Sequence, residues 1–255
     1  MGLWTIEFFW GVIPSFLFFV TFSYMLRSLL KDKKKAKIWI LRVIAITILV
    51  LEVIKQTKAL SNPNGYDRYS LPFHYCSLFL PVLPLHSFAS GKLKKYIDGI
   101  SFATLSSLFL VYMVVPTVLY PAGNFSAYFT SFSSFHTITF HHLVVLYLFL
   151  AIAFGSFNLK LKRDFPLVAT ILSIFVIIST TLSYTLDVNF HNLKHSNVDI
   201  IENNIRVPLN NALGNGGQVI YVALMFVFTT IIAYIGYLLL SIFYKRVAKG
   251  AFTIK

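Results

Sequence analysis

The sequence has 255 residues, of which 57% are hydrophobic and 12% charged, and its formal net charge is +13 at pH 7. A soluble domain carries about a quarter charged residues, so this composition excludes a soluble globular protein and indicates an integral membrane protein. The positive charge does not indicate a nucleic-acid partner, because the basic residues stand in short clusters between apolar stretches, as in membrane proteins.

Seven stretches are long and apolar enough for membrane helices, since a span needs roughly 17–25 mainly apolar residues. They are residues 6–26, 38–58, 71–90, 97–120, 135–155, 165–187 and 217–243. The longest connection, 188–216, is polar and rich in asparagine. We therefore predict an all-α fold in which residues 1–255 form a single seven-helix transmembrane domain.

Connections rich in lysine and arginine alternate along the chain with connections that are poor in them. The rich ones are 27–37, 91–96, 156–164 and the C-terminal tail. Cytoplasmic loops carry an excess of basic residues, so the pattern predicts an external N-terminus and a cytoplasmic C-terminus in the cell membrane. Arg42 would snorkel near the inner end of the second span.

Polar side chains of the predicted spans gather at their outer ends. They are Glu52, Lys55 and Gln56, then His74 and Cys76, then His136, His141 and His142, and finally Asp187, Asn215 and Gln218. Ionisable groups at membrane depth usually face a bundle interior or a wet cavity, so we expect one polar pocket that opens toward the outer leaflet. In a simpler interpretation, Glu52 and Lys55 only neutralise each other, three residues apart on one helix.

Cys76 is the single cysteine and lies in the stretch LPFHYCSLFLP. It is either a small buried packing residue or a nucleophile, and a nucleophilic thiol needs help to become the thiolate. On a helix His74 would not face Cys76, because residues two apart point in different directions, and it would share a face with Ser77 instead. We therefore expect the base to come from the histidines of the fifth span.

Asp187, His191, His195 and Asp199 are spaced by four, as ligands on one helix face would be. Two histidines four apart are a known metal-ligand spacing, so a metal-dependent membrane hydrolase is one alternative. The asparagine and serine residues between them favour turns. Our main expectation is therefore a solvated loop or a lid over lipid headgroups, with no metal and no cofactor.

Three short motifs carry a resemblance to a known family. Glu52 and Lys55 in the second span, LPFHYCS at the start of the third, and His141 followed by His-Leu-Val in the fifth resemble the YwaF-like family of bacterial membrane proteins. That family is related to the eukaryotic transmembrane protein 164 acyltransferases. The resemblance implies a lipid acyltransferase or transacylase with Cys76 as the nucleophile and His141 as its base.

The remaining polar residues have expected roles in this hypothesis. His136 and His142 compete with His141 for the role of base, and His74 with Ser77 would donate hydrogen bonds to the oxyanion. Glu52 and Lys55 would bind the phosphate of a membrane phospholipid or orient the catalytic groups. The alternative from another class is a transporter or receptor-like bundle whose polar cluster binds an ion or small anion.

Overall fold

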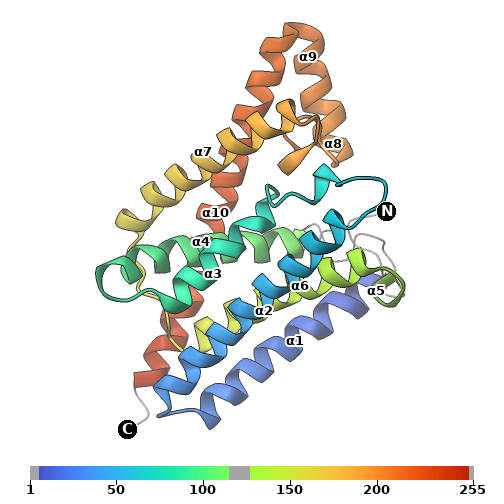
Figure 1. The fold of residues 1–255 in the computed structure, drawn as a ribbon. Helices are drawn as coiled ribbons and strands as arrows, with labels where there is room; N and C mark the ends of the chain where they lie inside the picture. Colours follow the sequence, from blue (N-terminus) through green and yellow to red (C-terminus); the bar gives the residue numbers. More distant parts are fainter. Residues whose placement is uncertain (1–5, 115–126, 253–255) are drawn as a thin grey trace.

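The computed structural model describes residues 6–114 and 127–252, which fold into helices without a strand (Figure 1). The long helices are α1 (Ile6–Leu29), α2 (Lys34–Leu60), α4 (Gly91–Val114), α6 (Phe132–Ala153), α7 (Leu161–Thr185) and α10 (Asn215–Phe252). The short ones are η1 (Arg68–Ser70), η2 (Tyr75–Leu78), α3 (Phe79–Phe88), α5 (Ala127–Thr130), η4 (Phe190–Asn192), α8 (Asp199–Ile201), the π-helix η5 (Glu202–Arg206) and α9 (Val207–Leu213). The predicted all-α fold is confirmed.

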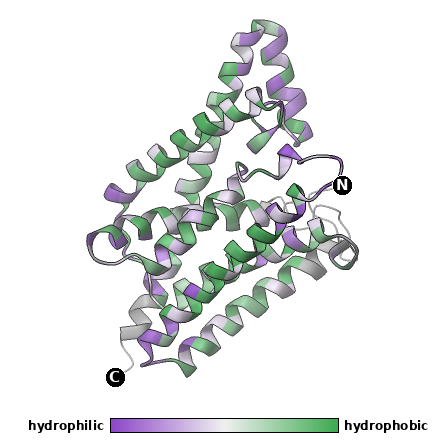
Figure 2. Cartoon of the chain, in the orientation of Figure 1, coloured by the Kyte–Doolittle hydropathy of each residue, from purple (hydrophilic) through white to green (hydrophobic). Residues whose placement is uncertain are grey.

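Among the residues that the structure describes, five helices are long and apolar enough to cross a membrane: α1, α4, α6, α7 and α10. Figure 2 shows their hydrophobic lengths, with hydrophilic residues gathered toward the helix ends. Helix α2 has 27 residues but carries Glu52 and Lys55 among its apolar side chains. The count of seven spans and the orientation of the termini therefore stay predictions, and residues 115–120 of the predicted fourth span lie outside the described residues.

The predicted continuous helix over 71–90 is wrong in its first part. Pro72 biases Leu71 toward an extended backbone, and Leu71 has ψ 142° while His74 has ψ 156°. Only a 3₁₀ turn, η2, precedes the 10-residue helix α3. That helix rises only about 15 Å, roughly half of a bilayer core. Cys76 therefore lies on a turn at the entry of a short helix.

Helix α4 lies among four neighbours, because it packs against α3, α6, α7 and α10. Its residues 97–108 are all buried, and many of them are serine, alanine or glycine, which allow helices to approach closely. At the crossing with α10, a Cβ atom added to Gly236 would come within 2.9 Å of the Ser106 carbonyl carbon. The buried part of α4 is therefore rich in small side chains, which lets its neighbours pack closely.

We call His86, Lys94, Asp98 and Tyr147 the inner cluster. Nδ1 of His86 lies 2.6 Å from the Tyr147 hydroxyl, and its Nε2 lies 3.4 Å from Asp98. Lys94 pairs with the same carboxylate at 2.6 Å. These contacts tie α3, α4 and α6 together near the connections that are rich in lysine, which lie on the lower left side of Figure 1 together with the C-terminus.

Asp164 is fully buried beside this cluster at the start of α7. Its carboxylate accepts hydrogen bonds from the Tyr237 hydroxyl and the Lys160 amide, both at 2.7 Å, and pairs with Arg163 at 2.5 Å. A Cβ atom on Gly99 would lie 2.3 Å from Asp164 Cγ. A glycine in α4 thus makes room for a buried charge that joins α7 to α10.

Candidate functional site

Glu52 is the centre of a polar cluster between α2 and α6. Its carboxylate accepts hydrogen bonds from Lys55 at 3.2 Å and from Gln56 at 2.6 Å. Nε2 of His136 lies 3.5 Å from its second oxygen, and the residue as a whole is only 9% exposed. Neutralisation by Lys55 is thus part of the arrangement, and His136 from a distant part of the sequence completes it. A carboxylate with three partners is better suited to holding other groups in place than to accepting a further proton.

Gln56 connects this cluster to the segment before Cys76. Its Nε2 donates to the Ser70 carbonyl at 2.7 Å, while its Oε1 accepts from the Tyr66 hydroxyl at 2.6 Å. Both partners lie in the connection that leads to η2. The polar end of α2 thereby fixes the path of the chain that presents the thiol.

Cys76 lies on η2, half-buried and packed against the edge of the hydrophobic core. The turn is closed by the Ser77 amide, which donates to the His74 carbonyl at 2.8 Å. The thiol is near enough to Lys55 and Glu52 for both of their charges to act on it. Glu52 and Cys76 therefore lie near each other, while their common depth in the membrane stays a prediction.

Tyr112 of α4 lies near both Cys76 and His141. The charge of Cys76 would act on its phenol, and its ring centroid is 5.4 Å from that of His141 on α6. The Tyr112 hydroxyl is buried and has no hydrogen-bond partner among the residues that the structure describes. Buried polar groups are nearly always paired, so this hydroxyl is a candidate for contact with a bound molecule.

The segment 186–193 covers the turn that carries Cys76, and we call it the cap. The ring of Phe190 packs against Phe73 and His74, with centroids 5.8 and 5.4 Å apart. His191 stacks on Tyr75 at 5.5 Å. The three ring-bearing residues directly before Cys76 therefore pack against a segment more than a hundred residues later in the sequence.

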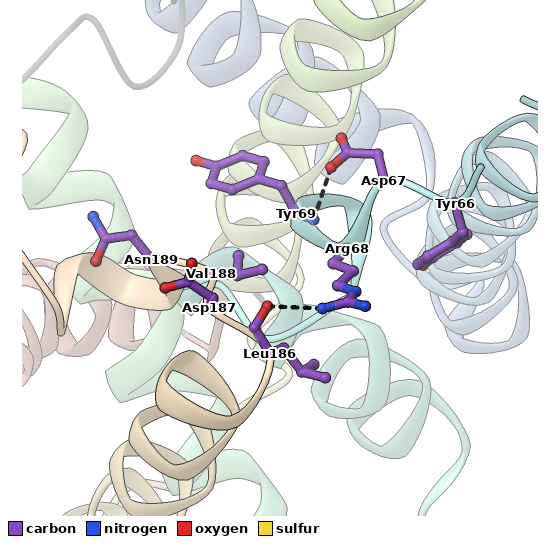
Figure 3. Close-up of a pocket in the computed structure, with 8 residues that line it drawn as sticks. All are labelled: Tyr66, Asp67, Arg68, Tyr69, Leu186, Asp187, Val188 and Asn189. Carbon is purple, nitrogen blue, oxygen red and sulfur yellow. Dashed lines mark hydrogen bonds between the residues drawn. The ribbon is translucent and has the colours of Figure 1, made fainter. Parts of the chain in front are cut away.

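A cavity of about 550 Å³ lies where the cap meets the connection before η2 (Figure 3). It is lined by Tyr66, Asp67, Arg68, Tyr69, Leu186, Asp187, Val188 and Asn189. The guanidinium of Arg68 donates to the Leu186 carbonyl at 3.3 Å and so bridges the two walls. Hydrogen bonding from Lys194 lowers the pKa of Asp187, which keeps a negative charge at the rim beside the positive charge of Arg68.

This cavity is connected to the turn through Tyr69. The Tyr69 carbonyl lies 3.2 Å from Nε2 of His74, and the charge of Cys76 would act on the Tyr69 phenol. Glu52, Cys76 and His141 do not line the cavity themselves. The polar cavity and the half-buried thiol are therefore neighbours, and Tyr69 lies near both.

His142 and His74, two of the predicted site residues, are engaged elsewhere. Nδ1 of His142 lies 2.7 Å from the Ile138 carbonyl, and its ring packs against Phe19 of α1. His74 is directed toward Tyr69 and Phe190 rather than along a helix face shared with Ser77. Of the histidines in α6, His136 thus contacts Glu52, His142 packs against α1, and His141 packs against Tyr112.

The spacing of four from Asp187 to Asp199 does not produce a ligand stripe, because α7 ends at Thr185. His191 lies inside the cap, 3.4 Å from the Thr229 hydroxyl, whereas His195 is exposed. In the described part of the chain, no three histidine, cysteine or acidic side chains gather closely enough to hold a metal ion.

Sequence reasoning missed Tyr112 and the cap. Tyr112 was detectable as a hydroxyl-bearing residue within an apolar span, but nothing in the spacing relates it to Cys76. The cap was expected only as a lid, without its contacts, because aromatic stacking between Tyr75 and His191 leaves no periodic trace in the sequence.

No curated protein and no solved structure matches the chain. The model of the TMEM164 family matches residues 3–237, which is nearly the whole sequence. The several apolar helices agree with a membrane location. The chain is therefore a membrane protein that belongs to the TMEM164 family.

Proposed function

We propose that the protein is a phospholipid acyltransferase of the cell membrane, as the resemblance to the YwaF-like proteins implies. Cys76 is the nucleophile, His141 the base, and Tyr112 the group that binds the oxyanion. The observation that supports this proposal is the buried Tyr112 hydroxyl, which has no partner among the described residues and belongs to a ring that contacts His141 and lies near Cys76.

The first half of the reaction forms a thioester. The Cys76 sulfur bonds to the carbonyl carbon of a fatty-acyl ester, and the carbon–oxygen bond to the glycerol breaks. The thiol proton passes to His141 and then to the departing glycerol oxygen, so that a lysophospholipid leaves. During attack the negative charge on the carbonyl oxygen is stabilised by a hydrogen bond from Tyr112.

The second half transfers the acyl group to an acceptor. The hydroxyl of a second lysolipid gives its proton to His141 and bonds to the acyl carbon. The carbon–sulfur bond breaks, and the proton returns to the Cys76 sulfur. No cofactor or oxidant is required for the atoms to balance, and the two half-reactions use the same base in opposite directions.

The cavity beside Tyr69 supports a role in binding the polar end of the lipid. Arg68 uses one guanidinium nitrogen on the Leu186 carbonyl, and its planar fork is suited to a phosphate. The apolar faces of α2 and α7 would hold the acyl chains. His136 and Lys55, through Glu52, keep the chain leading to Cys76 in place.

The experiment is a labelled-lipid gel with wild-type protein, Cys76→Ala and Cys76→Ser in lipid vesicles. We expect wild type to carry a lipid label that neutral hydroxylamine removes, as a thioester requires, and both variants to carry none. Cys76→Ser keeps a similar volume but a hydroxyl is far harder to deprotonate, so it is the matched control for folding.

The opposite result has a distinct meaning. Lipid remodelling that continues in Cys76→Ala would reduce Cys76 to a packing residue and end the proposal. A substrate flux that survives the same substitution would favour the transporter, whose ion would then bind at Glu52, Lys55 and His136.

A further inference from the structure

One face of α2 carries basic residues at its start and exposed apolar residues below them. Lys35, Trp39, Arg42, Ile46 and Leu49 follow a spacing of three and four and so lie along one stripe. Trp39 is 56% exposed and Ile46 44% exposed, although both are large and apolar. The stripe therefore has a cationic end and a hydrophobic length that is not covered by the described protein.

The side chain of Arg42 is fixed in place by three contacts at this end. Its guanidinium lies 5.2 Å from the ring centroid of Trp39 and 4.7 Å from that of Phe88 at the end of α3. Nε donates to the Ser87 carbonyl at 3.2 Å. These three contacts fix the plane of the guanidinium, and its two terminal nitrogens have no hydrogen-bond partner in the ranges 6–114 and 127–252.

The charge of this end is not neutralised by protein. Neither Arg42 nor Lys35 has an acidic partner within salt-bridge distance among the described residues. Of the acids near the inner end, Asp98 pairs with Lys94 and Asp164 with Arg163, whereas Asp32 in the connection before α2 is exposed and forms no salt bridge with Lys35 or Arg42. A simple snorkelling arginine would need neither the aromatic pair nor the fixed plane.

We propose that the stripe binds an anionic phospholipid of the leaflet that faces the basic connections. The terminal nitrogens of Arg42 hold the headgroup phosphate as a planar fork, and Lys35 adds a second positive charge. The acyl chains lie along Ile46 and Leu49. Trp39 lies at the depth where tryptophan prefers the membrane interface. This site is at the opposite end of α2 from Glu52 and does not depend on acyl transfer.

The test uses Trp39 as the reporter. The chain has three tryptophans, so Trp4→Phe with Trp10→Phe leaves Trp39 alone. The protein is placed in vesicles of phosphatidylcholine with a minor fraction of phosphatidylglycerol. Bromine atoms are carried either by the phosphatidylglycerol or by an equal fraction of the phosphatidylcholine. We expect the quenching to report roughly fivefold local enrichment of phosphatidylglycerol, which corresponds to about 1 kcal/mol for one engaged basic residue.

Two variants decide whether the enrichment belongs to the stripe. Arg42→Gln should bring the ratio close to that of bulk lipid, and Arg42→Lys should lower it partly, because lysine keeps the charge without the planar fork. Lys162→Gln removes an equal charge from an exposed position in the first turn of α7 and should leave the ratio unchanged.

Three results would overturn the proposal: equal quenching by the two brominated lipids, enrichment that survives Arg42→Gln, or an equal loss in Lys162→Gln. Circular dichroism checks that Arg42→Gln keeps its helices without the bond to Ser87. If it does not, Arg42→Lys and Lys35→Gln decide, and an unchanged ratio in both would be fatal.

Discussion

The inner cluster and the site around Cys76 use similar residues in different ways. Around Asp98 and Asp164, each carboxylate is almost completely buried and is bound by groups from several helices. Around Cys76, the thiol lies on a 3₁₀ turn that is half-buried, and its neighbours come from connections as well as helices. The first region connects helices through buried ion pairs, whereas the second presents a half-buried thiol on a turn.

The two regions differ in the pairing of their tyrosine hydroxyls, although the inner region also holds Nε2 of His86 without a hydrogen bond among the described residues. In the inner region the hydroxyls of Tyr147 and Tyr237 both have partners. Beside Cys76 the Tyr112 hydroxyl has none among the described residues. A buried hydroxyl that is paired stabilises one structure, whereas an unpaired hydroxyl can be completed by a ligand. Substitutions in the two regions should therefore separate stability from activity.

Replacing His141 should have the largest effect on activity. His141→Ala is expected to slow formation of the thioester by about 10²–10⁴-fold, the usual cost of losing a general base. His142→Ala is the matched control, because its ring belongs to the contact with α1. The rates are measured by single-turnover labelling, and equal losses in the two variants would remove His141 from its special role.

Asp164→Ala should instead lower the stability of the protein. It leaves the Arg163 charge and the Tyr237 hydroxyl without their buried partner, which costs about 3–5 kcal/mol of unfolding free energy. We expect a lower midpoint in detergent-based unfolding, and a normal thioester yield for the fraction that stays folded. A stable but inactive Asp164→Ala variant would mean that the inner region takes part in the reaction, and the two regions would then not differ in function.

Tyr112→Phe gives the sharpest separation, because it removes only a hydroxyl that makes no hydrogen bond with the described residues. The rate should fall by about 10²–10³-fold, as on loss of one oxyanion donor, while the unfolding midpoint stays near that of wild type. The opposite pattern, with full activity and a lower midpoint, would mean that an internal partner exists and that Tyr112 is structural.

The smallest effect is expected at Glu202, in the segment that follows the cap. Hydrogen bonds from Arg206 lower its pKa below the ordinary value of 4.5. Its contribution to stability is therefore present above that ordinary value and is lost as the pH falls through the lower pKa of the folded state. The pair is partly exposed, so Glu202→Gln should cost about 0.2–1 kcal/mol at pH 7.

This difference should shrink to nothing in acid. Thermal unfolding of wild type and Glu202→Gln is compared at pH 7 and at a pH below the lowered pKa. Glu202→Asp, which keeps the charge on a shorter side chain, serves as the control. A difference that grows on acidification would have the wrong sign for a carboxylate stabilised in its charged form.

The helices were predictable because they depend on local pattern. The spans over α1, α6, α7 and α10 follow from apolar length alone, and the gathering of Glu52 with His136 follows from equal depth. The broken third span was less visible, since Pro72 disfavours a helix at Leu71 but does not show where the chain goes next. The contacts of the cap and of Tyr112 could not be predicted, because they join residues that no sequence period relates.

The cap also has a backbone property with its own consequence. Asp187, His191 and Asn192 have φ of 56°, 52° and 58°, and they are the described non-glycine residues with positive φ. Asparagine, aspartate and histidine tolerate the left-handed region better than most residues, yet each such residue costs about 1–3 kcal/mol. If the cap lifted, these residues could return to right-handed backbone angles. That relaxation would offset part of the stacking lost by Phe190 and His191, so the way to the thiol would open at a lower net cost than its aromatic contacts suggest.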